Sequence, residues 1–187
     1  MPGVRVREVR GDVLDQPVEA LVNAWNRNFV PRRLLLTGGI SGQLKKVTGP
    51  GPWRDLARMG VLQVGDAVST SAGDMTGPKY LIHVAGLNIF WRASAAGVEA
   101  CARSAVEKAR ELGVTSMAMP LIGAGHGGLS PDISRAAIYR GLESAAAAPA
   151  GGDLDVVLCA PSGSLDRCPP SGTPRSLARL AASPGSA

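Results

Sequence analysis

Residues 18–26 read VEALVNAWN, and the glycine-rich turn TGGISG follows at residues 37–42. The first stretch predicts a short, buried apolar strand that ends at two asparagines, Asn23 and Asn26. The turn then leads through glycines into the expected start of a helix. Polar side chains and backbone N–H groups therefore point at one spot, and such a spot suits a phosphorylated ribose.

The rest of the chain shows the periodicities of a layered α/β domain. Strands are expected at residues 4–9, 20–22, 67–70, 80–84, 114–119 and 154–159. Helices are expected at residues 40–47, 95–112 and 131–147, and GPGPW at residues 49–53 is expected to break the first of them. Strands that alternate with helices predict a largely parallel central sheet, with the first strand a candidate for antiparallel pairing at one edge.

Length and composition favour one domain followed by a tail. A chain of 187 residues can bury one good core but hardly two. We expect the domain over residues 1–160, because residues 161–187 are rich in Pro, Ser, Gly and Arg and lose the apolar periodicity. The tail is expected to be disordered, although residues 176–182 could form one or two helical turns against another surface.

Composition also excludes several classes of protein. No apolar run approaches the roughly 20 residues of a membrane span. Arginines interrupt the N-terminal region, where a secretory signal would need apolar residues. We therefore expect a cytoplasmic protein with no membrane partner. The formal charge of +5 favours an anionic ligand, but no basic run with interleaved aromatics indicates nucleic-acid binding. The scattered cysteines, Cys101, Cys159 and Cys168, predict free thiols and neither a metal site nor a cofactor.

A second glycine-rich loop, GAGHGG at residues 123–128, follows a predicted strand as the first loop does. Ligands gather at the carboxyl ends of strands in open α/β sheets, so two such loops can clamp a diphosphate, whereas either loop alone is as well explained as a tight turn. GAGHGG also fits G-x-G-x-x-G, but it comes late and no acidic residue stands about 20 residues on. An enzyme of the dinucleotide-binding type is therefore the least favoured interpretation, and Leu129 stands where a P-loop needs lysine.

Several motifs, in their order along the chain, resemble those of macrodomains, the ADP-ribose-binding modules. GDV at residues 11–13 resembles the family's GDI, VEALVNAWN resembles V-(D/E)-A-I-V-N-A-A-N, and TGGISG resembles GGGVDG. GDAV at residues 65–68, KYLIH at 79–83 and AMP at 118–120 resemble G-E-A-x, K-Y-V-I-H and A-F-P. The resemblance runs from about residue 4 to residue 159, and it implies a three-layer α/β/α sandwich with a central mixed, largely parallel sheet.

The resemblance implies a role for each matching position. Asp12 would accept a hydrogen bond from the adenine amino group beside the Val13 backbone, and Asn26 would hold the distal ribose. The first loop would contribute Gly38, Gly39, Ile40, Ser41 and Gly42 to one side of the diphosphate, and the second loop Gly123, Ala124, Gly125, His126, Gly127 and Gly128 to the other. Two simpler interpretations remain open, because Asp12 could be a turn cap and Asn26 could satisfy local loop backbone.

The sequence departs from the family at the positions that carry catalysis. Ser41 replaces the first-loop aspartate of many deacylating macrodomains, and a hydroxyl is a poor general base. Another hydrolase branch uses a lysine and an aspartate at positions that here are about Gly38 and Gly127. His126, the only titratable residue within the second loop, is a candidate base or a ligand contact. His83, between two apolar residues of its strand, is expected to be a core residue or to support the site.

Two functions follow from this resemblance. The favoured one is hydrolysis of ADP-ribose from mono-ADP-ribosylated proteins, possibly at acidic side chains, with Asn26, Ser41 and His126 as the catalytic candidates and with a water held by Asn26 and the loops. The alternative is a non-catalytic reader of ADP-ribose, which the absence of the first-loop aspartate favours. Trp25, in place of a small residue, could pack in the core or wall the distal-ribose pocket. We expect a monomer, with nucleic acid a partner only if it carries ADP-ribose.

Overall fold

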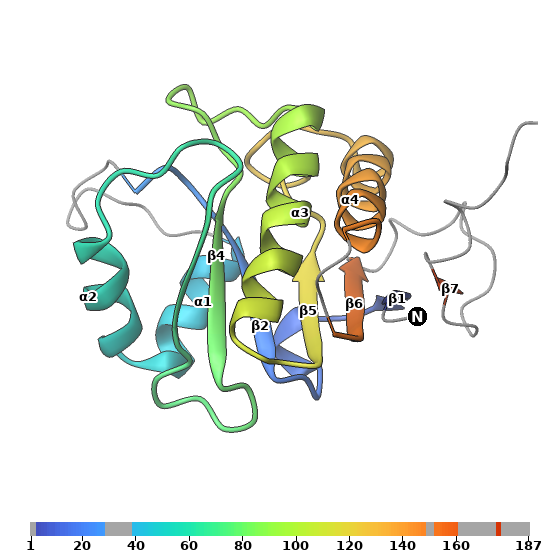
Figure 1. The fold of residues 1–187 in the computed structure, drawn as a ribbon. Coiled ribbons are helices and arrows are strands. Elements are labelled where there is room, and N and C mark those ends of the chain that lie inside the picture. Colours follow the sequence, from blue (N-terminus) through green and yellow to red (C-terminus); the bar gives the residue numbers. More distant parts are fainter. Residues whose placement is uncertain (1–2, 29–38, 149–151, 161–174, 177–187) are drawn as a thin grey trace, which may run out of the picture.

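The computed structural model describes residues 3–28, 39–148, 152–160 and 175–176 (Figure 1). One seven-stranded sheet has the order β3-β4-β2-β5-β6-β1-β7. Its strands are β1 (Val4–Arg10), β2 (Ala20–Trp25), β3 (Ala67–Ser71), β4 (Tyr80–Ala85), β5 (Ser116–Pro120), β6 (Leu154–Ala160) and β7 (Arg175–Ser176). The helices are α1 (Gly39–Thr48), α2 (Gly51–Arg58), α3 (Ala95–Glu111) and α4 (Pro131–Ala146), with a short 3-10 helix η1 (Val13–Asp15).

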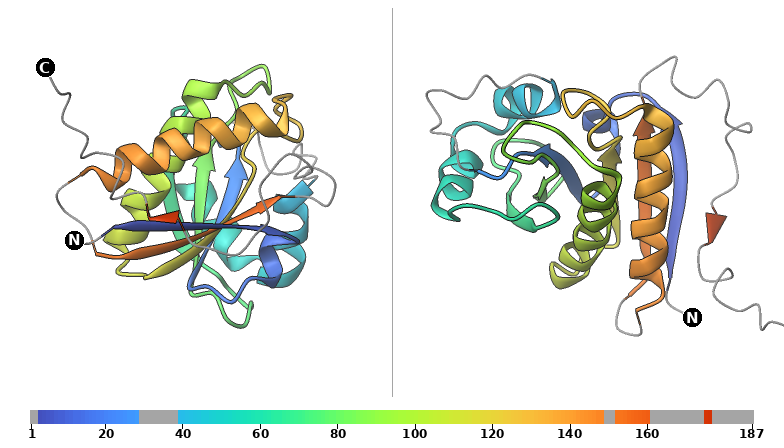
Figure 2. Two further views of the ribbon diagram at one scale, coloured as in Figure 1. Left: turned by 90° about the vertical axis from the view of Figure 1, so that its right-hand side faces the viewer. Right: turned by 90° about the horizontal axis from the view of Figure 1, so that it is seen from above.

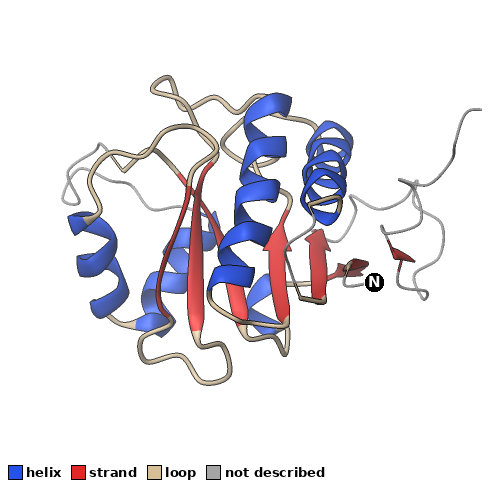
Figure 3. Cartoon of the chain, in the orientation of Figure 1, coloured by secondary structure: helices blue, strands red, loops and turns tan. Residues whose placement is uncertain are grey.

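The sheet is the middle of three layers (Figure 3). Because side chains alternate along a strand, neighbouring residues of β2 enter two different cores. Val22 belongs to the cluster that contains residues of α3 and α4, whereas Leu21 belongs to the cluster that contains Leu44 of α1 and Trp53 of α2. Helices α3 and α4 lie side by side over one face (Figure 2). The predicted three-layer α/β/α sandwich is confirmed.

The direction of the strands explains their composition. Neighbouring strands run parallel from β4 through β2, β5 and β6 to β1, and only the outer pairs, β3 with β4 and β7 with β1, are antiparallel. A strand covered on both faces is buried along most of its length, as in β4, where the residues from Leu81 to Ala85 are buried and His83 is the one polar side chain among them. The first strand does pair antiparallel at one side of the sheet, as expected, but with β7, which is the edge strand, while its other neighbour β6 runs parallel to it. At the opposite edge β3 is the antiparallel strand.

Helix α2 was not predicted from the sequence. The glycines and prolines of residues 49–53 end α1, as expected, but they also begin α2. Gly49 takes φ +66°, which ends one helix, and Pro52 sits in the first turn of the next, where its missing N–H is harmless. Trp53 and Leu56 then bury one side of α2 against the sheet.

Of the predicted tail, the structure describes only β7. Its two residues pair with β1 as Arg5↔Ser176 and Val6↔Arg175, so Ser176 lies in a strand and not in the helical turn expected there. The rest of that expected turn lies outside the described residues, and the boundary at residue 160 stays a prediction. None of the helices described is long and apolar enough to cross a membrane.

Candidate functional site

The parallel strands end at one edge of the sheet, and a cavity of about 1010 Å³ opens there. Its walls come from the segments that follow β1, β2, β4 and β5, from the first turn of α1, and from the start of α4. The lining residues are 11–13, 24–26, 39–41, 43, 86, 87, 91, 120–127, 131 and 159. This volume and this position are those of a small-molecule site in an α/β fold.

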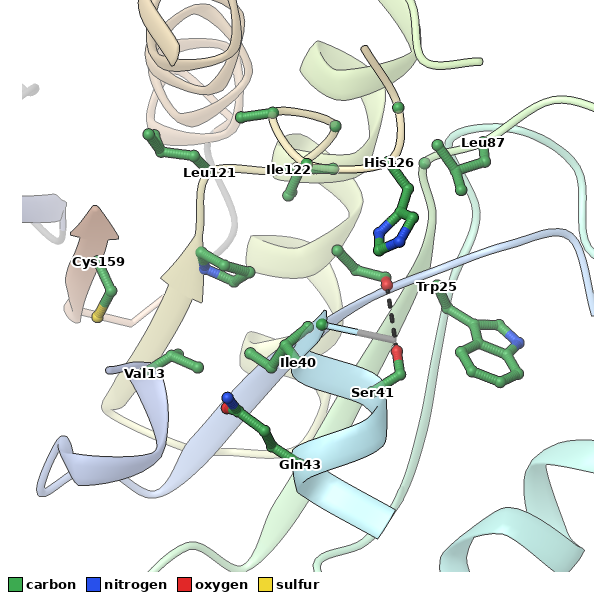
Figure 4. A pocket seen from close by; sticks show the side chains of 18 of the residues that line it. Val13, Trp25, Ile40, Ser41, Gln43, Leu87, Leu121, Ile122, His126 and Cys159 are labelled. Atoms are coloured by element: carbon green, nitrogen blue, oxygen red, sulfur yellow. Dashed lines mark hydrogen bonds between the residues drawn. The ribbon is translucent and has the colours of Figure 1, made fainter. Parts of the chain in front are cut away.

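The N-terminus of α1 forms one side of the cavity. Gly39, Ile40 and Ser41 make up the first turn of this helix and line the cavity (Figure 4). The first N–H groups of a helix have no partner within it, and together with the helix dipole they favour an anion. Gly39 takes φ +57°, a conformation that glycine adopts without strain.

The second glycine loop forms the opposite side. Figure 4 shows Ile122 and His126 across the cavity from Ile40 and Ser41. The loop is closed by hydrogen bonds from Leu129 N to Gly123 O at 3.1 Å and from Ala93 N to Gly127 O at 3.0 Å. A Cβ atom on Gly127 would lie 2.7 Å from Gly123 O, so only glycine fits this closure.

Asp12 begins η1 at one end of the cavity. Its Oδ1 accepts a hydrogen bond from Leu14 N at 3.0 Å, and its carbonyl accepts one from Gln16 Nε2 at 3.0 Å. Asp12 is therefore a turn cap, the simpler of the two roles considered from the sequence. The carboxylate is nevertheless exposed and lines the cavity, so the cap holds it at the place where a ligand can reach it.

Asn26 and Trp25 lie at the other end of the cavity. Asn26 is only 5% exposed, and its Oδ1 accepts a hydrogen bond from Asn28 N at 2.7 Å. One lone pair of this amide oxygen therefore serves the local backbone, and Nδ2 is the donor that the side chain can offer to a ligand. The Trp25 ring is 7% exposed, packs 5.5 Å from the Trp53 ring and also lines the cavity. Trp25 thus has both of the roles left open by the sequence.

Ser41 belongs to a buried chain of hydrogen bonds. Its Oγ donates to Asn23 Oδ1 at 2.8 Å, Asn23 Nδ2 lies 3.0 Å from His83 Nδ1, and His83 Nε2 lies 2.9 Å from Thr70 Oγ1. Complete burial lowers the pKa of His83 to about 3, so its imidazole is neutral near pH 7. His83 is therefore a core histidine that supports the cavity wall through Asn23.

Comparison with known proteins then assigns the chain to a family. The model of the Macro domain matches residues 22–138, which span both glycine loops. The chain belongs to the macrodomain family. A macro domain-containing protein of Streptomyces griseus is 37% identical over 128 residues, which cover 64% of this chain and 68% of that protein. The chain also matches uncharacterised mycobacterial proteins, of whose length the match spans about a third.

Solved macrodomain structures have the same fold. The macrodomain of Thermus aquaticus DarG aligns with a TM-score of 0.64 at 27% identity, covering 85% of this chain and 100% of that one. A Trypanosoma brucei macrodomain in complex with ADP-ribose aligns with a TM-score of 0.64 at 25% identity, covering 82% of this chain and 63% of that one. The overall fold of this macrodomain is thus that of known macrodomain structures.

The structure brings together most of the site residues predicted from the sequence. Those that line the cavity of this macrodomain are Asp12, Val13, Asn26, Gly39, Ile40, Ser41, Gly123, Ala124, Gly125, His126 and Gly127. Gly42 and Gly128 were also predicted, but neither is among the lining residues. Gly42 follows Ser41 on α1, where each step turns the helix by about 100°, and Gln43 lines the cavity in its place. Gly38 lies outside the described residues.

Several lining residues were not predicted. Gln43 lies one helical turn after Ile40, so the i, i+3 spacing of a helix was the signal that could have found it. Trp91 belongs to the loop between β4 and α3, at the top of Figure 1, and takes φ +59°. Asn88 holds this loop, because its Oδ1 accepts hydrogen bonds from Phe90 N at 2.9 Å and Arg92 N at 3.0 Å. Nothing in the local sequence indicates that this turn reaches the cavity.

The remaining reactive groups show what chemistry the cavity can supply. Burial raises the pKa of the Cys159 thiol to about 12, so this lining residue is not a nucleophile near pH 7. Among the described residues that line the cavity, the one carboxylate belongs to Asp12 and the one imidazole to His126. The described part of the chain holds no group of three or more His, Cys, Asp or Glu placed to bind a metal ion. The main features of the cavity are therefore backbone N–H groups, one buried amide and aromatic walls.

Proposed function

We propose that this macrodomain binds ADP-ribose and hydrolyses the bond between ADP-ribose and the side chains of mono-ADP-ribosylated proteins. The observation that carries the proposal is the pair of loops on opposite sides of one cavity, one at the N-terminus of α1 and one closed around Gly123 and Gly127. Two sets of backbone N–H groups that face each other suit a diphosphate, which carries negative charge on both phosphates.

The cavity has distinct ends that suit the two halves of this ligand, the adenosine and the distal ribose. In Figure 4, Val13 and Cys159 lie at one end and Trp25 and Leu87 at the other. Asp12, beside Val13, offers a carboxylate acceptor for the exocyclic amino group of adenine. The distal ribose then lies toward Trp25 and Asn26. The complex of the Trypanosoma brucei macrodomain with ADP-ribose supports this choice of ligand.

Hydrolysis at this site would depend more on the orientation of the substrate and the attacking water than on a side chain that acts as a general base. Asn26 offers its Nδ2 group, because Oδ1 is bonded to Asn28 N, and the glycine loops offer backbone N–H groups. Such donors can hold the distal ribose and a water in line, while the diphosphate of the substrate takes up the proton. His126 is exposed on the second loop and is the side chain placed to assist this proton transfer.

The test is the release of labelled ADP-ribose from a protein mono-ADP-ribosylated on Glu or Asp, with ADP-ribose affinity measured by calorimetry. Asn26→Asp is the matched variant, because a carboxylate still accepts from Asn28 N but no longer donates to the ligand. We expect release to fall by about 10²–10³-fold, as for the loss of one oriented donor, with a smaller loss of affinity. Unchanged release in Asn26→Asp would refute the catalytic role.

One observation favours a reader of ADP-ribose as the second candidate. Ser41, which replaces the first-loop aspartate of the deacylating relatives, is bonded to Asn23 and so is no free base. Binding of ADP-ribose, together with no release from acidic, serine, arginine or nucleic-acid linkages, would establish the reader. A preference for NAD over ADP-ribose would instead indicate a dinucleotide-using enzyme. The monomeric state and the cytoplasmic location stay predictions from the sequence.

A further inference from the structure

Four polar side chains connect an edge strand of the sheet with the wall of the cavity. Thr70 lies on β3, His83 on β4, Asn23 on β2 and Ser41 on α1, and each is at most 7% exposed. Asn23 and His83 face each other in the register of the parallel pair β2 and β4. The Trp53 ring packs edge-on to the imidazole at 5.6 Å. These groups therefore form one buried chain whose last member lines the cavity.

The hydroxyl proton of Thr70 determines which group donates and which accepts at each step of this hydrogen-bond chain. The hydroxyl has one proton, and it donates to Ser71 O at 3.0 Å. The same oxygen lies 2.9 Å from His83 Nε2, so at that contact Thr70 accepts and the ring nitrogen carries the proton. Among the described residues no carboxylate bonds to the buried imidazole, whose ring nitrogens contact Asn23 and Thr70, so the imidazole is neutral and its Nδ1 is an acceptor.

The direction continues from His83 to the cavity. An acceptor at Nδ1 requires that Asn23 present Nδ2 to it, at 3.0 Å, which turns Asn23 Oδ1 toward Ser41. Ser41 Oγ lies 2.8 Å from this Oδ1, an oxygen that can only accept, so the single hydroxyl proton of Ser41 is used there. What Ser41 shows to the cavity is the lone pairs of its oxygen.

We infer that Thr70, His83 and Asn23 are positioning residues that fix the Ser41 hydroxyl as a hydrogen-bond acceptor toward the ligand. A phosphate oxygen also only accepts, so the Ser41 hydroxyl does not bind the diphosphate, although its place in the first glycine loop suggests that contact. Its partner is a group that donates, namely a hydroxyl of the distal ribose. Ser41 lies beside the end of β2, with Ala24 O 3.5 Å from its Oγ, and this is the end of the cavity assigned to that sugar. The identity of the ligand rests on the proposed function.

If every donor and acceptor in the hydrogen-bond chain were exchanged, the opposite prediction would follow for Ser41. This exchange needs a proton on His83 Nδ1, the Asn23 amide turned over and Thr70 donating to Nε2, which breaks the bond to Ser71 O. Ser41 would then donate into the cavity and would suit a phosphate. The two directions therefore differ in the tautomer of His83, which can be measured without any ligand.

The first measurement is a long-range ¹H–¹⁵N correlation spectrum of the ligand-free protein. The chain has only two histidines, so His126→Gln assigns the remaining imidazole to His83 at once. We expect the neutral Nε2–H tautomer of His83 across pH 6–8. The Nδ1–H tautomer, or an imidazolium, would overturn the inference. Because this measurement needs neither a variant of the chain of hydrogen bonds nor a ligand, it is independent of the proposed function.

The second measurement tests whether the hydrogen-bond chain affects ligand binding through Ser41. Thr70→Val removes the acceptor for Nε2–H, and Thr70→Ser keeps it as the matched control. We expect Thr70→Val to weaken ADP-ribose binding about fivefold, the worth of one ordinary hydrogen bond, and Thr70→Ser to retain wild-type affinity. In a Ser41→Ala background, Thr70→Val should have no further effect on affinity.

The outcomes separate the two proposals. An equal loss of affinity from Thr70→Val with and without Ser41 would mean general damage to the fold and would overturn the inference. Equal affinity of Thr70→Val and wild type would overturn it as well. If the wild-type protein shows the Nε2–H tautomer but does not bind ADP-ribose, the proposed function fails. The assignment of donors and acceptors in the hydrogen-bond chain is then still supported by the spectrum.

Discussion

Acidification is expected to destabilise this protein through His83. The imidazole is completely buried, which lowers its pKa to about 3, whereas an unfolded histidine has a pKa of about 6.5. Between these two values the unfolded chain binds a proton that the folded protein refuses, so stability falls as the pH falls below 6.5. Each pH unit in this window costs about 1.4 kcal/mol, and at pH 5 the cost from this one group is about 2 kcal/mol.

The assay is urea unfolding of the wild type and of His83→Gln at pH 7, 6 and 5. Other groups titrate over the same range, but they are common to both proteins and cancel in the difference. We expect the wild type to lose about 2 kcal/mol more than His83→Gln between pH 7 and pH 5. His126→Gln, which changes the exposed histidine, is the control and should keep the wild-type slope.

Two results would refute this reasoning. Parallel pH profiles of wild type and His83→Gln would mean that the imidazole takes up its proton in the folded state at the same pH as in the unfolded one. Water would then reach the ring, in contradiction to its burial beside Trp53. Loss of the slope in His126→Gln instead would assign the acid sensitivity to the loop.

Three further changes test other parts of the structure. Gly127→Ala places a Cβ 2.7 Å from Gly123 O and so forces the loop to shift, and calorimetry should show ADP-ribose affinity reduced about tenfold or more. Gly141→Ala drives a methyl group into a backbone carbonyl of α3, and urea unfolding should show a loss of about 1–3 kcal/mol, with ligand affinity of the folded protein retained. The Lys79 ammonium, whose Nζ lies 2.7 Å from Glu19 Oε1, lowers the pKa of Glu19 to about 2. The stability that Glu19 adds is therefore present above about pH 4.5 and is lost as the pH falls toward 2. Glu19→Gln should unfold at a lower temperature than the wild type at pH 7, and its unfolding temperature should depend less on pH between about 4.5 and 2.

Much of the fold could be predicted because its signals are local. The apolar stripe of residues 95–112 predicted α3, which runs from Ala95 to Glu111, and the proline at 131 marked the start of α4. The glycine loops were found because a backbone that comes close to a ligand excludes side chains, and that requirement shows in the letters themselves. Eleven of the predicted site residues line one cavity, since strands that run parallel bring the loops after them to one edge.

The errors concern relations between distant segments. The parallel pairing of β1 with β6 was not predicted, because alternation along one strand says nothing of its neighbour, and β6 lies about 150 positions further along the chain. Helix α2 was missed because eight residues with Gly and Pro at the start look like a loop until Trp53 and Leu56 are buried. Trp91 reaches the cavity only because its loop closes on Asn88 and is tied to the second glycine loop.

The sequence by itself determined the layered α/β class, the family motifs and the two loops that flank the cavity, because periodicity, glycine and asparagine act on the backbone within a few residues. The sequence also predicted His83 as a core residue or a support of the site, and the structure confirms this. Only the tertiary structure decided which hydrogen-bond partners Ser41 and His83 have. The chain from Thr70 to Ser41 draws its four members from three strands and a helix, and each proton in it is placed by a partner remote in sequence. The register of the sheet sets those contacts, and burial sets the pKa of His83, so neither could be predicted from the residues alone.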